Sequence, residues 1–145
     1  MKKLLSSLLA MMLCLSILLP TTLAASQATS SSYTIWYEDG SCAEIVTTIS
    51  FARSTLSADK DYTYLNSSGK KAFTYTLHGE FDGSTGRATR ASSSATIFIS
   101  GWSLSSHDEY CSGNTAYGNA TFDGPNNASR DVSLTLTCDK NGNIT

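Results

Sequence analysis

The sequence predicts an all-β protein, an antiparallel β-sandwich of about seven or eight short strands that is immunoglobulin-like in general architecture. Three observations lead to this prediction. Apolar residues alternate with polar ones, clusters of Gly, Asn, Asp and Ser separate the alternating stretches, and no stretch longer than a turn or two has helical spacing. Strict alternation places one side of a strand on a core and the other in water, and many short strands divided by turns are typical of sandwiches.

Four stretches show the alternation most clearly. The apolar residues that share a face are Phe73, Tyr75, Leu77 and Phe81 in one stretch, Val132, Leu134, Leu136 and Cys138 in another, Ile45, Ile49 and Phe51 together with Thr47 in a third, and Ile97 and Ile99 in a fourth. We expect the fourth strand to continue through Gly101, as a bulge, to Trp102 and Leu104. Shorter stretches at 33–37, 62–65 and 115–122 complete the set. Turn signals such as Asp39-Gly40 and Asp82-Gly83 separate them.

The first 24 residues are expected to be a signal peptide that is removed. Lys2 and Lys3 precede an apolar run at 4–19, and Thr22 and Ala24 place small residues at the −3 and −1 positions of a cleavage site. The run is shorter than the roughly 20 apolar residues that a membrane-spanning helix needs, and serines interrupt it. We therefore expect cleavage after Ala24, no membrane anchor on the mature chain, and a secreted, extracellular protein.

The mature chain is predicted to be one domain. Residues 25–32 are rich in Ser and Thr and are expected to form a flexible leader, and residues 33–145 a single β domain. About 120 residues are enough to build one core. The whole chain has a formal net charge of −2, loss of Lys2 and Lys3 makes it more negative, and no basic cluster is present. Nucleic acid and anionic membrane surfaces are therefore not expected as partners.

Several segments resemble a family of short secreted all-β proteins of Gram-positive bacteria. The segments that carry the resemblance are Tyr37-Glu38-Asp39-Gly40-Ser41, Ile45-Val46-Thr47-Thr48-Ile49, Tyr62 to Gly69, Ser112 to Ala116, and Leu134 to Cys138, so that it covers most of the mature chain. The family has no assigned function, so the resemblance implies no functional residue. Its members often carry a cysteine in the segment that matches residues 87–91, suited to pairing with the terminal cysteine. Thr89 occupies that segment here, and Cys42 and Cys111 are additional.

Clusters of ionisable residues give no strong catalytic or metal-binding signal. His107-Asp108-Glu109 is the densest, but three consecutive residues cannot all face one ion on a strand, and no His-x-x-x-His spacing exists. We expect this cluster to be a solvated loop. Glu80 and Asp82 could form a glycosidase pair, although carboxylates at a strand end more often keep an edge soluble.

The C-terminal segment at 139–143 places side-chain oxygens like a calcium loop. It lacks the glycine at the sixth position and the acid at the twelfth, so a hairpin-type turn explains it better. No catalytic residue, metal site or cofactor is therefore predicted.

Aromatic residues are the feature that points toward binding. Trp36, Tyr64 and Trp102 are the candidate ligand-binding residues, because amphipathic rings exposed on a β face stack on sugars or anchor a protein partner. The alternative is that these rings fill the core. The sequence favours a secreted, non-enzymatic domain that acts by surface contact with a glycan or a protein. A small secreted hydrolase, or a secreted toxin or inhibitor, is the alternative.

Three cysteines remain in the mature chain, in an oxidising compartment where thiols tend to pair. Cys111 and Cys138 each end a predicted strand and lie close along the meander, so a Cys111–Cys138 disulfide is the preferred pairing. It would leave Cys42 free or bridging two chains. A chain with all three thiols reduced and buried is the competing possibility.

Overall fold

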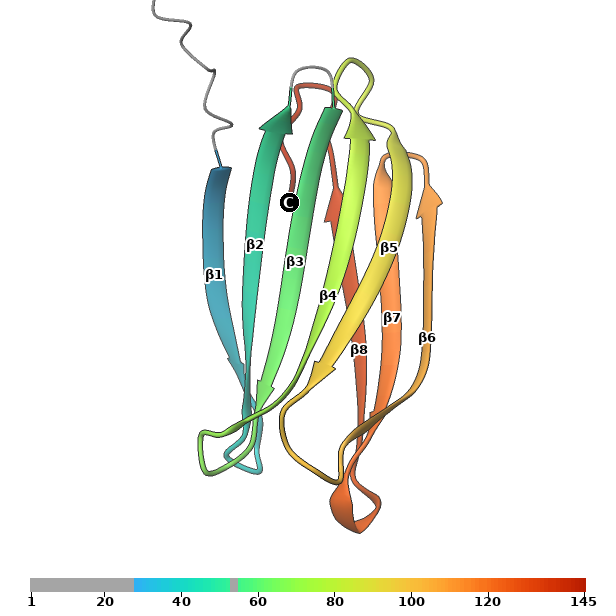
Figure 1. The fold of residues 1–145 in the computed structure, drawn as a ribbon. Helices are drawn as coiled ribbons and strands as arrows, with labels where there is room; N and C mark the ends of the chain where they lie inside the picture. The colour runs from blue at the N-terminus through green and yellow to red at the C-terminus, as the bar shows by residue number, and fades with distance from the viewer. Residues whose placement is uncertain (1–27, 53–54) are drawn as a thin grey trace, which may run out of the picture.

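Eight strands form two antiparallel sheets that pack face to face, as the computed structural model shows (Figure 1). The structure describes residues 28–52 and 55–145, so the predicted signal peptide lies outside the described residues. The larger sheet contains β1 (Ala28–Trp36), β2 (Cys42–Ala52), β3 (Thr55–Leu65), β4 (Lys71–Asp82) and β5 (Ala88–Ile97). The smaller sheet contains β6 (Ser103–Ser112), β7 (Thr115–Asp123) and β8 (Ser129–Thr137), and a short 3-10 helix, η1 (Pro125–Asn127), joins β7 to β8. The predicted all-β sandwich is confirmed.

Each strand pairs with its neighbours in sequence. The order is β1-β2-β3-β4-β5 in one sheet and β6-β7-β8 in the other, so the chain crosses from one sheet to the other at a single connection, between β5 and β6. The result is two consecutive meanders, whereas an immunoglobulin domain uses Greek-key connections. The likeness to immunoglobulin domains therefore ends at the two-layer antiparallel architecture. No helix in the described part of the chain has the length and hydrophobicity needed to span a membrane.

The core follows the alternation of β4 and β8. The buried apolar residues predicted from the sequence include Phe73, Tyr75, Leu77 and Phe81 on β4 and Val132, Leu134, Leu136 and Cys138 on and after β8. A stack of aromatic rings joins the two sheets, since the rings of Phe73 and Phe122 lie parallel with centroids 3.8 Å apart. Tyr64, the cross-strand partner of Phe73 in the larger sheet, packs beside it with ring centroids 5.3 Å apart.

Four predictions about local structure are wrong. The stretch predicted to run from Ile97 to Leu104 is not one strand, because β5 ends at Ile97 and β6 begins at Ser103. Gly101, expected as a bulge, has a φ of +94° in the connection between the sheets, a conformation that glycine adopts without strain. Part of the expected flexible leader, from Ala28 onward, belongs to β1. The cluster that begins at His107 lies within β6 and is not a loop.

The sandwich is open on one side because the two sheets differ in width. The smaller sheet packs against β3, β4 and β5, while β1 and β2 extend beyond β8 (Figure 1). All nine residues of β1 are consequently exposed. On the opposite side the edges of β5 and β6 approach each other, and their side chains are in contact there.

Candidate functional site

The open side of the sandwich carries large apolar residues on the inner face of β1 and β2. Alternation and register place Tyr33 and Ile35 of β1 on the inner face of the larger sheet, opposite Ile45 and Ala43 of β2. Ile49 and Phe51 of β2 lie on the same face, toward the other end of this strand pair. We call Tyr33, Ile35, Ile49 and Phe51 the open face. Tyr33 is 58% exposed, Ile35 41% and Phe51 40%, and Ile49 is partly buried. The smaller sheet does not reach over β1 and the end of β2, so the inner face of the larger sheet is open to solvent there.

The neighbouring edge of β8 is blocked. Lys60 on β3 donates from Nζ to the carbonyl oxygen of Thr135 at 2.7 Å, and burial lowers the pKa of this lysine. Further along the edge, the backbone groups of Thr137 and Thr145 form two hydrogen bonds, each residue donating one. These contacts satisfy polar backbone groups that an edge strand otherwise exposes. The open face thus lies beside an edge that is already partly occupied.

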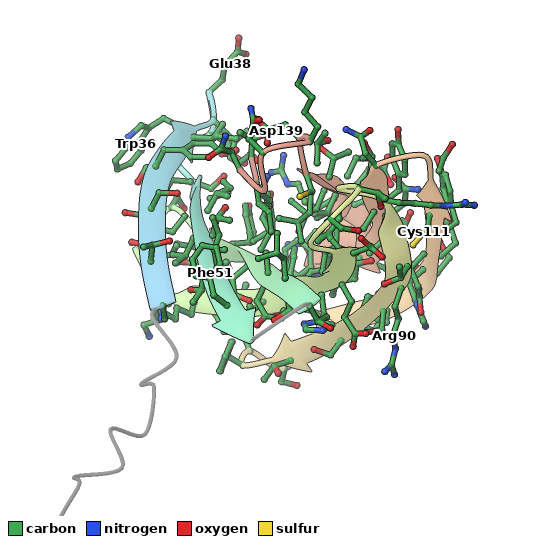
Figure 2. All side chains as sticks on the ribbon, turned by 90° about the horizontal axis from the view of Figure 1, so that it is seen from above. Trp36, Glu38, Phe51, Arg90, Cys111 and Asp139 are labelled. Atoms are coloured by element: carbon green, nitrogen blue, oxygen red, sulfur yellow. The ribbon has the colours of Figure 1, made fainter. Side chains whose placement is uncertain are left out.

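Of the three predicted ligand-binding residues, two lie together in the core. Tyr64 is buried, and its ring meets that of Trp102 edge-on with centroids 5.3 Å apart. Both rings pack on Phe73. Trp36, in contrast, is 73% exposed on β1, at the opposite side of the sandwich from Cys111 (Figure 2). The structure therefore does not place the three rings on one binding surface, and Trp36 alone is fully available to a partner.

An arginine holds the buried tyrosines at one end of the sandwich. The guanidinium of Arg130 lies over the rings of Tyr37 and Tyr64, 4.2 and 4.9 Å from their centroids. Its Nη2 donates to Tyr64 Oη at 3.3 Å and lies 3.7 Å from a carboxylate oxygen of Asp39. The hydroxyls of Tyr37 and Tyr62 are hydrogen-bonded at 2.8 Å, and burial, then this bond, raises the pKa of Tyr62. The cluster joins β8 to β3 and to the β1–β2 turn by cation–π and charged contacts.

Sequence reasoning missed Arg130. Its signal is the phase of β8, because Val132, Leu134 and Leu136 face inward and the same alternation turns Arg130 inward two residues earlier. Nothing in the sequence indicated that the guanidinium of Arg130 would pack on the rings of Tyr37 and Tyr64, which come from other segments. In the described chain its Nε is buried and has no hydrogen-bond partner.

The outer face of the larger sheet carries a second charged cluster. His78 lies with Nδ1 2.7 Å from Asp59 Oδ1 and Nε2 3.6 Å from Glu80 Oε1, and Arg90 lies 3.5 Å from the same Glu80 oxygen. The two carboxylates thus contact the ring of His78 and the guanidinium of Arg90 across β3, β4 and β5, which is typical of a solvated sheet face. Glu80 is thus engaged with His78 and Arg90.

Asp82, the other member of the possible carboxylate pair, has a different role. Its Oδ1 accepts hydrogen bonds from the backbone N–H groups of Ser84 and Thr85 and from the Ser84 hydroxyl. These bonds, led by that from the Ser84 hydroxyl, lower the pKa of Asp82 to about 2. Asp82 therefore caps the β4–β5 turn. An open depression of about 410 Å³ lies beside this turn, lined by Thr55, Thr89 and residues 80–84.

His107 contacts Ser93, a residue that the sequence analysis did not single out. Ser93 on β5 lies with Oγ 3.4 Å from His107 Nδ1 and 3.2 Å from Glu109 Oε2, and His107 Nδ1 lies 3.2 Å from the same Glu109 oxygen. In a serine–histidine–acid triad the two ring nitrogens serve different partners, whereas here Nδ1 faces both. Asp108 is turned toward Asn119 on the other face. The arrangement joins β5 to β6.

No metal centre is found among residues 28–52 and 55–145. No group of three or more His, Cys, Asp or Glu side chains is positioned there to hold an ion. The calcium-like segment forms a turn, in which Asp139 Oδ1 accepts from the backbone N–H groups of Asn141 and Asn143. This is the hairpin-type turn that the sequence favoured.

The structure does not bring Cys111 and Cys138 together. Both are free thiols, as is Cys42, and β7 lies between β6 and β8. Two strand spacings amount to about 10 Å, whereas a disulfide needs Cα atoms within about 7 Å. Cys138 is buried and its thiol faces the carbonyl oxygen of Asp139, while Cys111 is exposed on β6. Burial raises the pKa of both thiols.

Comparison with models of protein families, with characterised proteins and with solved structures finds no match. The class of protein is therefore defined by the fold alone, an open-sided antiparallel β-sandwich.

Proposed function

We propose that this chain is a secreted, non-enzymatic β-sandwich that acts by surface contact, with the open face as its contact surface. The observation that carries the proposal is the exposure of Tyr33, Ile35 and Phe51 on the one face of β1 and β2 that forms the core elsewhere in the same sheet. A face that exposes several large apolar residues is typical of interaction sites.

The chemistry of this surface favours a protein partner over a glycan. Ile35 and Phe51 offer no hydrogen-bonding group, and an aliphatic side chain contributes to binding by burial of apolar area. The aromatic ring of Tyr33 is suited to anchoring a protein partner and also to stacking on a sugar. A glycan ligand is therefore the second outcome that the binding test must distinguish.

An enzymatic role has less support in the geometry. The depression beside the β4–β5 turn is open, and its acidic residues are held by the contacts described above. Ser93, whose Oγ lies 3.4 Å from His107 Nδ1, shares that ring nitrogen with the carboxylate of Glu109. Neither arrangement presents a nucleophile activated by an adjacent base.

The test is a binding screen of the purified protein against peptidoglycan, soluble glycans and extracellular matrix proteins, followed by variants. Phe51→Ser and Tyr33→Ser should each weaken binding of the identified ligand by about tenfold, the loss of one well-buried apolar contact. Tyr110→Ser on β6 is the matched control, because Tyr110 is 49% exposed and lies on the other side of the sandwich. Equal loss in all three variants, or unchanged binding in Phe51→Ser, would contradict the proposed surface.

A further inference from the structure

The edge strands of this sandwich are not equally protected against pairing with another chain. Edge strands expose unpaired backbone groups, and proteins commonly block them with charged side chains or with covering segments. β5 carries Arg90, and β6 carries three consecutive ionisable residues from His107 to Glu109. β8 is blocked by Lys60 and by the pairing of Thr145. Three of the four edge strands in the described chain therefore carry a feature that blocks pairing with another strand.

In the part of the chain that the structure describes, no such feature protects β1. Its nine residues, Ala28–Trp36, include no Asp, Glu, Lys, Arg, His or Pro, and all nine are exposed. It pairs with β2 over its full length without a register shift, so it is regular along its length. A long, regular and uncharged edge strand is the kind that accepts another strand.

The hydrogen bonding of the β1–β2 turn shows which backbone groups of β1 are free. Tyr37 donates its N–H to the carbonyl oxygen of Ser41, so this pair is of the hydrogen-bonded type. Pairs of this type recur at every second residue, which directs the backbone groups of 29, 31, 33 and 35 toward β2. The groups that face away from β2 belong to Ala28, Ser30, Ser32, Thr34 and Trp36.

We propose that a second copy of this chain pairs with β1 in antiparallel fashion, with Ser32 opposite the second copy's Ser32 on a two-fold axis. Ser32 is the central residue of β1 and also one of the five whose backbone groups are free, so this register pairs all nine residues. Any other symmetric register leaves part of the strand unpaired.

The side chains suit this register. Trp36 lies opposite the second copy's Ala28, Ile35 opposite its Thr29, and Tyr33 opposite its Ser31, so that each large side chain meets a small one. No charged residue on β1 opposes another across the axis. The two larger sheets become one continuous sheet of ten strands, with the open faces of both copies on the same side.

This self-association does not rest on the proposed function. It uses the edge of β1, whereas ligand binding uses the open face, and Phe51 on β2 belongs only to the latter. The two proposals can therefore fail separately. A monomeric protein still has an open face that can bind a ligand, and a protein that binds no ligand can still dimerise through β1.

Charge substitution at the axis tests the proposal. We expect the full chain, expressed and purified, to sediment as a dimer in analytical ultracentrifugation at high protein concentration. Ser32→Lys places two like charges directly opposite each other and should raise the dissociation constant about tenfold or more. Ser32→Glu should do the same, and an equimolar mixture of the two variants should dimerise again. Ser94→Lys is the matched control, because Ser94 is an exposed serine on the other edge strand of the larger sheet.

Amide hydrogen exchange provides a second measurement that does not depend on the variants folding equally well. The N–H groups of Ser30, Ser32 and Thr34 should be protected in the wild-type dimer and should exchange faster on dilution. A monomeric wild-type protein, a dimer that Ser32→Lys leaves intact, or variants that fail to recover on mixing would each overturn the proposed pairing.

Discussion

Phe73 is the central ring of the aromatic stack between the sheets, so its replacement tests the assignment of the core. The side chain is fully buried and contacts Phe122, Tyr64 and Trp102, with ring centroids 3.8, 5.3 and 5.1 Å away. Replacing Phe73 with Ala removes the whole ring and leaves a cavity, and such a change costs about 3–5 kcal/mol of unfolding free energy. A domain of this size has about 5–15 kcal/mol in total.

Because Phe73→Ala can remove most of the stability, Phe73→Leu provides a second measurement. Leucine keeps most of the apolar volume but loses the ring contacts, so the expected cost is about 1–2.5 kcal/mol. Urea unfolding followed by tryptophan fluorescence gives both values, since Trp102 lies in contact with the ring. Thr135→Ala is the control, because Thr135 is exposed on the outer side of β8 and should change stability by at most about 0.5 kcal/mol. Equal effects of Phe73→Leu and Thr135→Ala would refute the assignment of the buried face.

Four further predictions concern other features. Because hydrogen bonds from Ser84 and Thr85 hold the pKa of Asp82 near 2, below its ordinary value of 3.8, its stabilising effect is present above about pH 4 and is lost toward pH 2. The difference in unfolding free energy between wild type and Asp82→Asn should therefore narrow over that range, and a constant difference would contradict this. Burial raises the pKa of Tyr62 above its ordinary value of 10.0, so the wild type should lose stability as the pH rises above 10, and Tyr62→Phe should lose less of it in urea titrations at alkaline pH. Gly118→Ala places a Cβ 2.9 Å from both Leu77 Cδ1 and Tyr75 Oη, so it should lower the unfolding free energy by about 1–3 kcal/mol, and an unchanged melting temperature would show that the sheets adjust freely. Finally, intact-mass measurement of exported protein should show Ala25 as the first residue, and retention of residues 4–19 would contradict the signal peptide.

The strands that the sequence predicts well are those with one buried face. β4 and β8 bury every second residue between the sheets, so their hydrophobic alternation is strong and the predicted core residues are the observed ones. Hydrophobic alternation arises because one face of a strand is buried, so it is weak in strands at the edge of a sheet.

The edge strands show the limits of this reasoning. β5 has small residues, Ala91, Ser93 and Ala95, on its inner face, and β1 is exposed throughout, so neither has a clear apolar period. β6 is an edge strand of the smaller sheet and is largely exposed, so it carries charged residues. For this reason its sequence resembled a loop.

The candidate surface was less predictable than the fold. Whether an aromatic ring is buried or exposed depends on which strand of the other sheet lies over it, and this follows from sheet width and not from local sequence. Tyr64 and Tyr33 both lie on the inner face of the larger sheet, yet Tyr64 lies beneath the smaller sheet and Tyr33 lies beyond it. The Arg130 cluster likewise depends on a register between segments 66 residues apart.

The single crossing between the two meanders has a consequence for how the chain folds. Every strand pair joins segments that are adjacent in sequence, so each sheet can grow hairpin by hairpin with short loops to close. Contacts between distant parts of the chain arise only when the two meanders dock, and the stacking of Phe73 on Phe122 is one of them. A sandwich of this connectivity has a lower contact order than one with Greek-key crossings, and it should fold faster than other all-β domains of its length. Docking of two preformed sheets is then the late step, so mutations in the interface between them should mainly accelerate unfolding.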